Sequence, residues 1–448
     1  MRKILLMRLF GTSGIRGLAL TEITPDLACS VGMALGSIVS DSVAVGMDTR
    51  TTSPLLKDAL VSGLLSCGVD VYDVSMVPTP ALGFAIRSLE ASAGVMITAS
   101  HNPPEYNGIK VFDSEGCAYS DEHSIERIVE GSQFKKASWD AIGTYENVDV
   151  EDEYVDFLTN KMNLEKKRVV IDAGGGAASV VAPVVLRSLG CDVVAINCTP
   201  TGFFPRGLEP TRENLSLLAK TVADTGADLG VALDGDADRT SIVDEYGEYV
   251  TYDESLALIA GFMMQKGKRI VTTVDASLSL DAYLHSFGAE IYRTRIGDYA
   301  VAQEIKRVGA TFGGEPSGTW IFPDKSLTPD GIYSSCMVLQ MKDKLGSLHE
   351  AKTNVPKFTS LRGKMSCPNE KKAYATQIAE YFLREMNPKE ISNLDGVSAF
   401  FQDGFLSIRP SGTEPYMRIR AESEIHERAE YYLESGMTIV KRILEKEG

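Results

Sequence analysis

The stretch that decides the fold reads VAVGMD at residues 43–48, and an apolar segment connects it to GVDVYDV at residues 68–74. Runs of valine and alanine predict buried strands. The aspartate marks a turn after the first strand and the glycine precedes the second, with room for one helix between them. This order predicts a unit of strand, helix and parallel strand.

The same order recurs twice further along the chain. VVID at residues 169–172 leads to GCDVV at residues 190–194, and RIVTTVD at residues 269–275 leads to GAEI at residues 288–291. Three copies predict three related α/β domains with mixed, mostly parallel sheets.

The last part of the chain has a different pattern. AFFQDGFLSI at residues 399–408 is typical of a hairpin with an Asp-Gly turn, YMRIR at residues 416–420 predicts a further strand, and a helix is expected from about Ile425. We therefore predict a C-terminal α+β domain with an antiparallel sheet, hinged near Pro356. The four domains, arranged around a central cleft, are predicted at residues 1–146, 147–245, 246–355 and 356–448.

The composition is that of a globular protein and limits its partners. Of the 448 residues, 44% are hydrophobic and 24% are charged, which is enough apolar material for several cores. The formal net charge of −16 predicts neither nucleic acid nor an anionic membrane as a partner, because both would be repelled. No apolar run of about eighteen residues is found, so no membrane-spanning helix is expected. An anionic substrate must then be bound locally, by clustered arginines.

The cysteines and the N-terminal residues bear on the cellular compartment of the protein. The seven cysteines are scattered and lack CxxC spacing, which favours a reducing cytoplasm over a disulfide framework or a zinc site. The opening MRKILLMR begins like a signal peptide, but Arg8 ends its apolar run too early. We expect a cytoplasmic protein, and the sequence leaves its oligomeric state open.

The first candidate functional segment reads ITASHNPPEYNGIK at residues 97–110. Its two prolines lack amide hydrogens and keep the preceding asparagine out of helical angles, so the loop displays Ser100 beside His101. Lys110 ends the segment. Taken alone, the stretch is equally compatible with an ordinary Asn-Pro-Pro turn.

The second candidate segment, LDGDADR at residues 233–239, carries carboxylates at alternate positions. An extended backbone would direct Asp234, Asp236 and Asp238 to one side, where they suit a hard cation. The alternatives are a solvated acidic turn and a calcium EF-hand loop, whose last ligand would be Glu245. A strand-like segment stands where an EF-hand has a helix, and this favours magnesium.

Two further loops carry polar side chains between glycines and prolines. GEPSG at residues 314–318 offers a carboxylate and a hydroxyl. RPSGTEP at residues 409–415 places hydroxyls and free amides near Arg418 and Arg420, which suits an anion.

These four segments, in this order and at this spacing, resemble the serine, metal, sugar and phosphate loops of the α-D-phosphohexomutase superfamily. The resemblance covers nearly the whole chain. FGTSGIRG at residues 10–17 looks most like the phosphoglucosamine mutases, and GGEPSGTW at residues 313–320 looks like their archaeal branch.

The resemblance implies an isomerase that moves phosphate between C6 and C1 of a hexose, expected here to be glucosamine 6-phosphate, feeding UDP-N-acetylglucosamine synthesis. A phosphoserine at Ser100 would give its phosphoryl group to make a bisphosphorylated sugar and take another back. One Mg²⁺, bound by Ser100, Asp234, Asp236 and Asp238, would draw charge off the phosphoryl group. The nearest alternative is the same chemistry on mannose or glucose phosphates.

Charge handling at the transferred phosphate is expected from Arg16, His101 and Lys110. Lys110 is a candidate general base, which requires neighbouring positive charge, such as Arg16 and Arg239, to lower its pKa. His101 is expected to orient the phosphoserine. The structural alternative for Arg16 is a surface arginine after a glycine-rich turn.

The resemblance assigns substrate binding to Arg239 and to the last two loops. Glu315 and Ser317 would bind ring hydroxyls, while Pro316 and Thr319 depart from the glutamine and histidine of related enzymes. Arg420 also fits a basic edge strand. The phosphate that does not react is expected at Arg409, Ser411, Gly412, Thr413 and Arg418.

The sequence contains two further candidate binding segments, and two other classes of function remain as alternatives. DAGGGAAS at residues 172–179 lacks the third glycine of a dinucleotide fingerprint and the lysine of a P-loop, so no nucleotide site is expected. TRIGD at residues 294–298 is a candidate for substrate contacts. A metal-dependent phosphatase would release free phosphate, and a non-catalytic sugar-phosphate sensor would bind without turnover.

Overall fold

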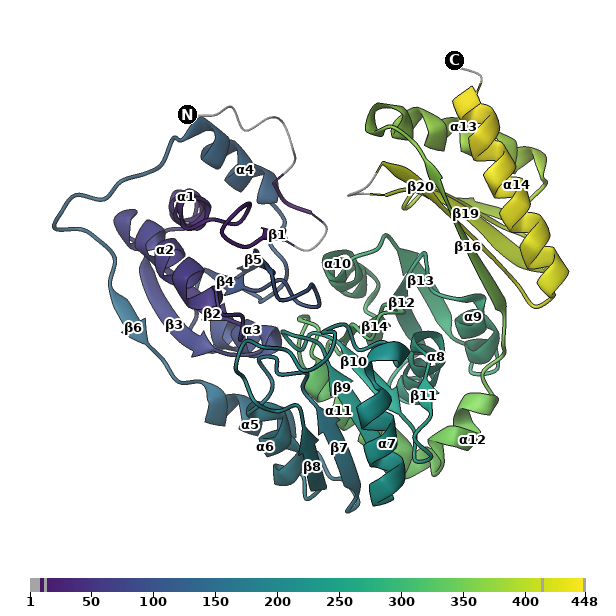
Figure 1. The fold of residues 1–448 in the computed structure, drawn as a ribbon, viewed down its shortest axis with the longest axis horizontal. Helices are drawn as coiled ribbons and strands as arrows, with labels where there is room; N and C mark the ends of the chain where they lie inside the picture. The colour runs from purple at the N-terminus through teal and green to yellow at the C-terminus, as the bar shows by residue number, and fades with distance from the viewer. Residues whose placement is uncertain (1–8, 12–13, 412–414, 446–448) are drawn as a thin grey trace. The chain divides into compact units, whose positions relative to one another are not determined.

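The computed structural model describes residues 9–11, 14–411 and 415–445 and contains two compact units (Figure 1). The first unit comprises the described residues up to Ser255 together with Ser317–Lys352. The second comprises Leu256–Pro316 together with the described residues from Thr353 onward. Each unit is therefore assembled from two separate stretches of the chain.

The N-terminal sheet of the first unit is built from six strands, β1 (Ile15–Leu18), β2 (Ser42–Met47), β3 (Asp70–Met76), β4 (Ala93–Ile97), β5 (Tyr106–Asp113) and β6 (Tyr145–Asn147). Their order is β1-β5-β4-β2-β3-β6. β2 runs parallel to β3 and β4, and β3 runs parallel to β6. β5 is antiparallel to both of its neighbours, which makes the sheet mixed.

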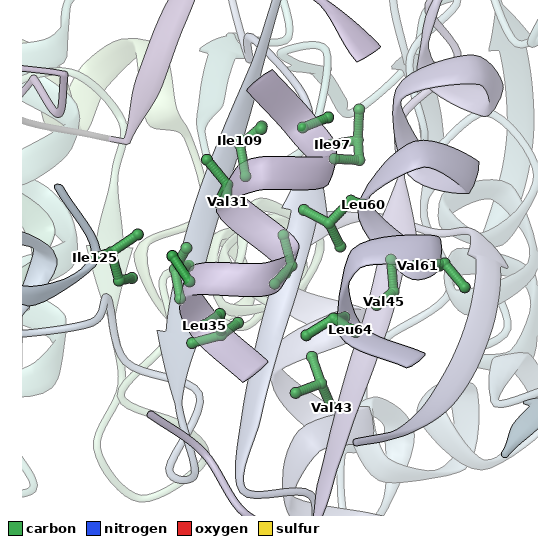
Figure 2. Packing of buried hydrophobic residues seen from close by; sticks show 14 of the residues in the cluster. Val31, Leu35, Val43, Val45, Leu60, Val61, Leu64, Ile97, Ile109 and Ile125 are labelled. Carbon is green, nitrogen blue, oxygen red and sulfur yellow. The ribbon is translucent and has the colours of Figure 1, made fainter. Parts of the chain in front are cut away.

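The helices of this region are α1 (Pro25–Gly36), α2 (Ser53–Ser66), α3 (Thr79–Ser88) and α4 (Glu122–Gly131). Apolar side chains of α1, α2 and α4 form one buried cluster with those of the strands (Figure 2). α1 and α2 approach each other closely, because a Cβ atom at Gly32 would lie 2.2 Å from the carbonyl oxygen of Leu60, and one at Gly63 would lie 2.3 Å from that of Cys29. Glycine at both positions is what allows this packing.

The second sheet of the first unit is built from β7 (Arg168–Asp172), β8 (Asp192–Ile196), β9 (Leu229–Leu233), β10 (Thr240–Val243) and β11 (Tyr249–Val250). Their order is β11-β10-β9-β7-β8, with β7 parallel to β8 and β9 and with β10 antiparallel to its neighbours. The strand β15 (Trp320–Ile321) also belongs to this unit, as do the helices α5 (Glu151–Thr159), α6 (Val181–Ser188), α7 (Ser216–Thr225) and α11 (Gly331–Leu345).

The second unit begins with three parallel strands, β12 (Arg269–Thr273), β13 (Glu290–Thr294) and β14 (Phe312–Gly314). β12 lies between the other two, and the helices of this part are α9 (Leu278–His285) and α10 (Asp298–Val308). The chain passes between the units within two helices, α8 (Tyr252–Met263) and α12 (Leu348–Thr353), and once more at Pro316.

The C-terminal part of the second unit is an antiparallel sheet of β16 (Thr359–Ser366), β17 (Glu390–Ser392), β18 (Val397–Phe400), β19 (Gly404–Pro410) and β20 (Tyr416–Ser423). Their order is β16-β20-β19-β18-β17. Two helices, α13 (Lys372–Glu385) and α14 (His426–Glu445), pack on one face (Figure 1). Exposed and half-buried residues alternate along β16, as expected for a sheet with only one covered face.

The predicted fold class is confirmed. Three regions contain α/β elements, two of them with mixed sheets, and the last has an antiparallel sheet. The domain boundaries at residues 146, 245 and 355 and the central cleft stay predictions. Within the described residues, no helix is both long and apolar enough to cross a membrane.

Candidate active site

Ser100 follows β4 in the first unit and is buried, with a left-handed backbone at a φ of 51°. Few residues other than glycine adopt this conformation. The hydroxyl of Ser100 donates to Oδ2 of Asp234 at 2.6 Å and lies 3.2 Å from Nδ1 of His101. The structure therefore brings the predicted serine and metal loops together.

The three aspartates of the predicted metal loop form a compact cluster. Their ligand oxygens all lie within 4.8 Å of one another, and the side chains of Asp234, Asp236 and Asp238 are buried. The loop is a turn and not the extended backbone that the alternating sequence suggested, since Ala237 has a φ of 60°. The carboxylates meet because the chain reverses.

This cluster has the donor atoms that a hard divalent cation requires. The buried Oδ1 atoms of Asp236 and Asp238 have no hydrogen-bond partner among the described residues. A buried carboxylate oxygen without a hydrogen bond is costly. Together with Asp234 and the Ser100 hydroxyl, these atoms make an oxygen-only site that fits Mg²⁺.

Lys110 supplies positive charge to the cluster. Its Nζ lies 2.6 Å from Oδ2 of Asp236 and 2.8 Å from Oδ2 of Asp238. Burial alone would lower the pKa of Lys110, but the charges of the two aspartates outweigh it and raise that pKa. The lowered pKa that a general base needs is therefore not found in this arrangement.

The pKa values of Asp236 and Asp234 are shifted in opposite directions. Burial opposes the charge of Asp236, but the adjacent ammonium of Lys110 and a 2.6 Å hydrogen bond from Thr79 Oγ1 hold its pKa below the ordinary value. Asp234 does not contact Lys110, and burial together with the charges of Asp238 and Asp236 raises its pKa well above the ordinary value. A bound cation would offset the repulsion between the carboxylate of Asp234 and those of Asp236 and Asp238.

Arg16 and Arg239 add positive charge near the serine. Nη1 of Arg16 donates to Oδ1 of Asn102 at 3.1 Å, and Nε of Arg239 lies 3.8 Å from Oδ1 of Asp238. Burial lowers the pKa of His101 to about 2, with the charges of Arg239 and Arg16 adding to the effect. The imidazole is therefore neutral, which suits an orienting role.

The predicted sugar loop lies where the chain passes from the second unit to the first. Ser317 belongs to the first unit, where its Oγ lies 3.1 Å from Oγ1 of Thr319. Thr319 forms an isolated β-bridge with Arg239. Glu315 belongs to the second unit, where its Oε2 accepts a hydrogen bond from the amide of Gly297 at 3.3 Å. This bond connects Glu315 with the candidate segment TRIGD.

The predicted phosphate loop follows β19 in the second unit. Arg409 of β19 lies opposite Arg418 of β20, and Lys364 of β16 lies opposite Arg418 on its other side. Like charges directly opposite each other destabilise a sheet, and an anion would offset this cost. Nη1 of Arg409 is 3.0 Å from Oδ2 of Asp395.

The backbone of Ser411 is fixed at the start of this loop. Its amide donates to the carbonyl of Tyr416 at 2.8 Å, and its own carbonyl accepts from Nζ of Lys372 at 2.5 Å. Gly412 and Thr413, which the sequence also predicted to bind phosphate, lie outside the described residues.

Sequence reasoning missed two arginines that hold the serine and metal loops, the buried Arg50 and the half-buried Arg206. Arg50 pairs with Asp48 and contacts the serine loop, while Arg206 pairs with Asp172 at 3.0 Å and donates to the carbonyl of Leu233 at 2.8 Å. Asp48 and Asp172 are the acidic turns of the first two repeats. A buried aspartate needs a positively charged or hydrogen-bonding partner. The two acidic turns were therefore the signal in the sequence that pointed to such arginines.

Four sequence models of one family match the chain in succession. They are described as phosphoglucomutase/phosphomannomutase, alpha/beta/alpha domains I, II and III, at residues 7–136, 152–247 and 251–358, and the C-terminal domain at residues 364–435. A curated protein from Pyrococcus horikoshii, named probable phosphoglucosamine mutase, is 49% identical over 444 residues, or 98% of each chain.

Two solved structures resemble this chain along nearly its whole length. A phosphoglucomutase/phosphomannomutase family protein from Burkholderia thailandensis superposes with a TM-score of 0.87 at 27% identity, over 97% of each chain. An N-acetylphosphoglucosamine mutase from Aspergillus fumigatus, in complex with GlcNAc-6P and magnesium, has a TM-score of 0.60 at 16% identity, over 99% of this chain and 97% of that one. The second likeness is one of fold.

Proposed function

Because the chain belongs to the phosphoglucomutase/phosphomannomutase family, we propose that it is a phosphoglucosamine mutase that interconverts glucosamine 6-phosphate and glucosamine 1-phosphate. The observation that carries this proposal is the 2.6 Å contact between the Ser100 hydroxyl and Asp234, inside a buried cluster of carboxylates and one lysine. The choice of glucosamine is supported by the relative named a probable phosphoglucosamine mutase at 49% identity.

In the proposed reaction Ser100 starts as a phosphoserine. A sugar hydroxyl attacks its phosphorus, the bond from phosphorus to Oγ breaks, and a new bond to the sugar oxygen gives a bisphosphorylated sugar. The hydroxyl proton passes to a base in the site, and the leaving oxygen, which is Oγ of Ser100 in this step and the sugar oxygen in the return step, takes up a proton. The sugar then turns end for end, and its other phosphoryl group moves to Oγ of Ser100, so that no water is consumed and no phosphate is released.

The cation is proposed to be one Mg²⁺ held by Ser100, Asp234, Asp236 and Asp238. When bound, it supplies Lewis-acid stabilisation for the charge on the phosphoryl oxygens. The buried Oδ1 atoms of Asp236 and Asp238, which accept no hydrogen bond from the described residues, support this assignment. The magnesium in the Aspergillus fumigatus complex, a protein with the same fold, also supports it.

The remaining residues are proposed to bind and orient. His101 orients the phosphoserine, and Arg16 and Arg239 offset its charge. Lys110 stays a candidate for handling the hydroxyl proton. Glu315 and Ser317 are assigned to the ring hydroxyls. The phosphate that does not react is assigned to Arg409, Ser411, Gly412, Thr413 and Arg418, and the row of like charges that includes Lys364 supports an anion there.

Parallel assays with glucosamine, glucose and mannose 6-phosphates test this function in the wild type and in Ser100→Ala, measuring both sugar 1-phosphate and free phosphate. We expect the highest kcat/KM with glucosamine 6-phosphate, no turnover in Ser100→Ala and no free phosphate. A higher kcat/KM for a neutral sugar phosphate would assign the alternative substrate. Phosphate release that survives Ser100→Ala would identify a phosphatase, and tight binding without turnover would identify a sensor.

We also propose a cytoplasmic location. All seven cysteines are free, which agrees with a reducing compartment. Fractionation of cells that express the protein tests this, and recovery outside the cytoplasmic fraction would contradict it.

A further inference from the structure

Arg50 is a buried arginine at the start of the loop that leads into α2, and every one of its N–H donors is used. It is only 1% exposed, and its Nε donates to Oδ2 of Asp48 at 3.0 Å. A guanidinium has five donors in a fixed plane. The other four donate at 2.6–2.9 Å to the carbonyl oxygens of Ser100, Asn102, Pro103 and Tyr106.

The backbone that Arg50 contacts is strained at Ser100. A left-handed φ of 51° costs free energy for any residue with a Cβ atom, and the surrounding contacts must hold it in place. The amide of Ser100 donates to Oγ1 of Thr98 at 2.8 Å, and Thr98 in turn donates to Oδ2 of Asp48 at 2.7 Å. The Asp48–Arg50 pair therefore fixes the residue from both its amide and its carbonyl side.

We propose that Arg50 is a positioning residue, which keeps Ser100 in its left-handed conformation and so directs the hydroxyl toward Asp234. The effect of Arg50 on turnover rests on the proposed function, in which Ser100 transfers the phosphoryl group. A lysine cannot replace this arginine, because an ammonium has three donors around one nitrogen and cannot reach four carbonyls spread along a loop.

The first experiment compares Arg50→Lys with Arg87→Lys. Arg87 lies in the same sheet region and also donates to a backbone carbonyl, that of Glu115 at 3.2 Å, but it does not contact the serine loop. Per folded molecule, we expect Arg50→Lys to lower kcat about 100-fold, with the KM for sugar phosphate within about threefold of the wild type, because the sugar and the second phosphate are bound by other loops. Arg87→Lys should keep the wild-type kcat. A folded Arg50→Lys enzyme with wild-type kcat would overturn the proposal.

The second experiment needs no turnover and so separates this inference from the proposed function. Arg50→Lys is introduced into Ser100→Gly, which adopts a positive φ without strain, and into Ser100→Ala, which does not. We expect Arg50→Lys to lower Tm less in the glycine background than in the alanine background. Equal loss of Tm in both, or failure to fold in both, would overturn the proposal, because Arg50 would then support the domain and not the conformation of residue 100. Absence of turnover in the wild type would instead refute only the proposed function.

Discussion

The hydroxyl oxygen of Ser100 lies 2.6 Å from Oδ2 of Asp234, although 134 residues separate the two in sequence. Both side chains are buried, and Asp234 is the aspartate of the cluster whose pKa burial and the neighbouring carboxylates raise. Keeping the carboxylate of Asp234 charged therefore costs free energy, and a cation bound beside it would offset that cost.

Asp234→Asn should stabilise the protein when no divalent cation is present, by about 1 kcal/mol, because it removes a buried carboxylate repelled by Asp236 and Asp238. It should also reduce the rise in Tm on adding Mg²⁺ and, by removing a ligand, nearly abolish turnover. Thermal denaturation in EDTA and in Mg²⁺ measures both effects.

Asp244→Asn is the matched control, because Asp244 is equally buried but its pKa is lowered. Burial opposes its charge, and the hydrogen bond from Lys352 at 2.7 Å helps to outweigh that effect. The control should lower Tm with and without Mg²⁺. A lower Tm for Asp234→Asn in EDTA would contradict the first prediction.

Lys110→Met should destabilise the cation-free protein by about 3 kcal/mol, since it leaves Asp236 and Asp238 without their ammonium partner. Mg²⁺ should restore more stability to this variant than to the wild type, because the cation supplies the missing charge. Urea denaturation with and without Mg²⁺ measures the difference.

Lys57→Met provides the comparison for Lys110. Lys57 forms a buried ion pair with Asp73, outside the aspartate cluster, so its loss should destabilise the protein without any added response to Mg²⁺. If Mg²⁺ stabilises the two variants to the same extent, the prediction is wrong, and the ammonium of Lys110 does not take the place of a cation at the aspartate cluster.

Arg418→Met should lower kcat/KM for sugar phosphates about 10-fold or more, since a hydrogen bond to a charged group contributes about 1.5–3 kcal/mol. Inorganic phosphate should raise Tm less in this variant than in the wild type. Arg362→Met, on β16 opposite Arg420, is the control and should leave kcat/KM nearly unchanged. Equal losses in both variants would indicate a general effect of positive charge on this face and not a phosphate site.

Asp330 should make stability fall as pH rises through mildly acidic values. Burial raises the pKa of Asp330 to about 6, against the hydrogen bonds from the Tyr333 amide and the Tyr154 hydroxyl. The folded chain thus binds this proton more tightly than the unfolded chain, so the stabilising contribution is complete below about pH 4 and is lost through about pH 6, in total about 3 kcal/mol.

Denaturation of the wild type and Asp330→Asn from pH 4 to 8 measures this contribution. The difference in unfolding free energy between the two should decline up to about pH 6 and then stay level. Tyr154→Phe, which keeps the carboxyl group, should retain the pH dependence. A difference that does not change with pH would show that Asp330 titrates normally.

The elements that the sequence predicted well are those with local signals. The Asp-Gly hairpin is present, with Phe400 opposite Phe405, and the last helix begins at His426, one residue from its expected start. Strand β2 matches the VAVGM run to within one residue. Turn residues and hydrophobic runs act over a few positions, so they can be identified without knowing what lies nearby in space.

What the sequence did not reveal depends on distant contacts. The antiparallel placement of β5 beside β4 is set by tertiary pairing. The turn at Ala237 was hidden, because alternating aspartates suit a strand equally well. Arg50 has no periodic or motif signal of its own, and the four backbone carbonyls that it holds lie fifty or more residues away, beginning with that of Ser100.

Glu315 and Ser317 are separated by one residue but belong to different compact units. During synthesis on a ribosome, the segment Leu256–Pro316 emerges long before the C-terminal stretch that completes its unit, whereas Ser317–Lys352 emerges afterwards and joins the unit made first. The order in which the two units are completed therefore differs from the order of their segments along the chain. Until Thr353 and the residues after it are made, Leu256–Pro316 lacks the other stretch of its unit, and apolar surface exposed in this interval would favour misassembly or aggregation.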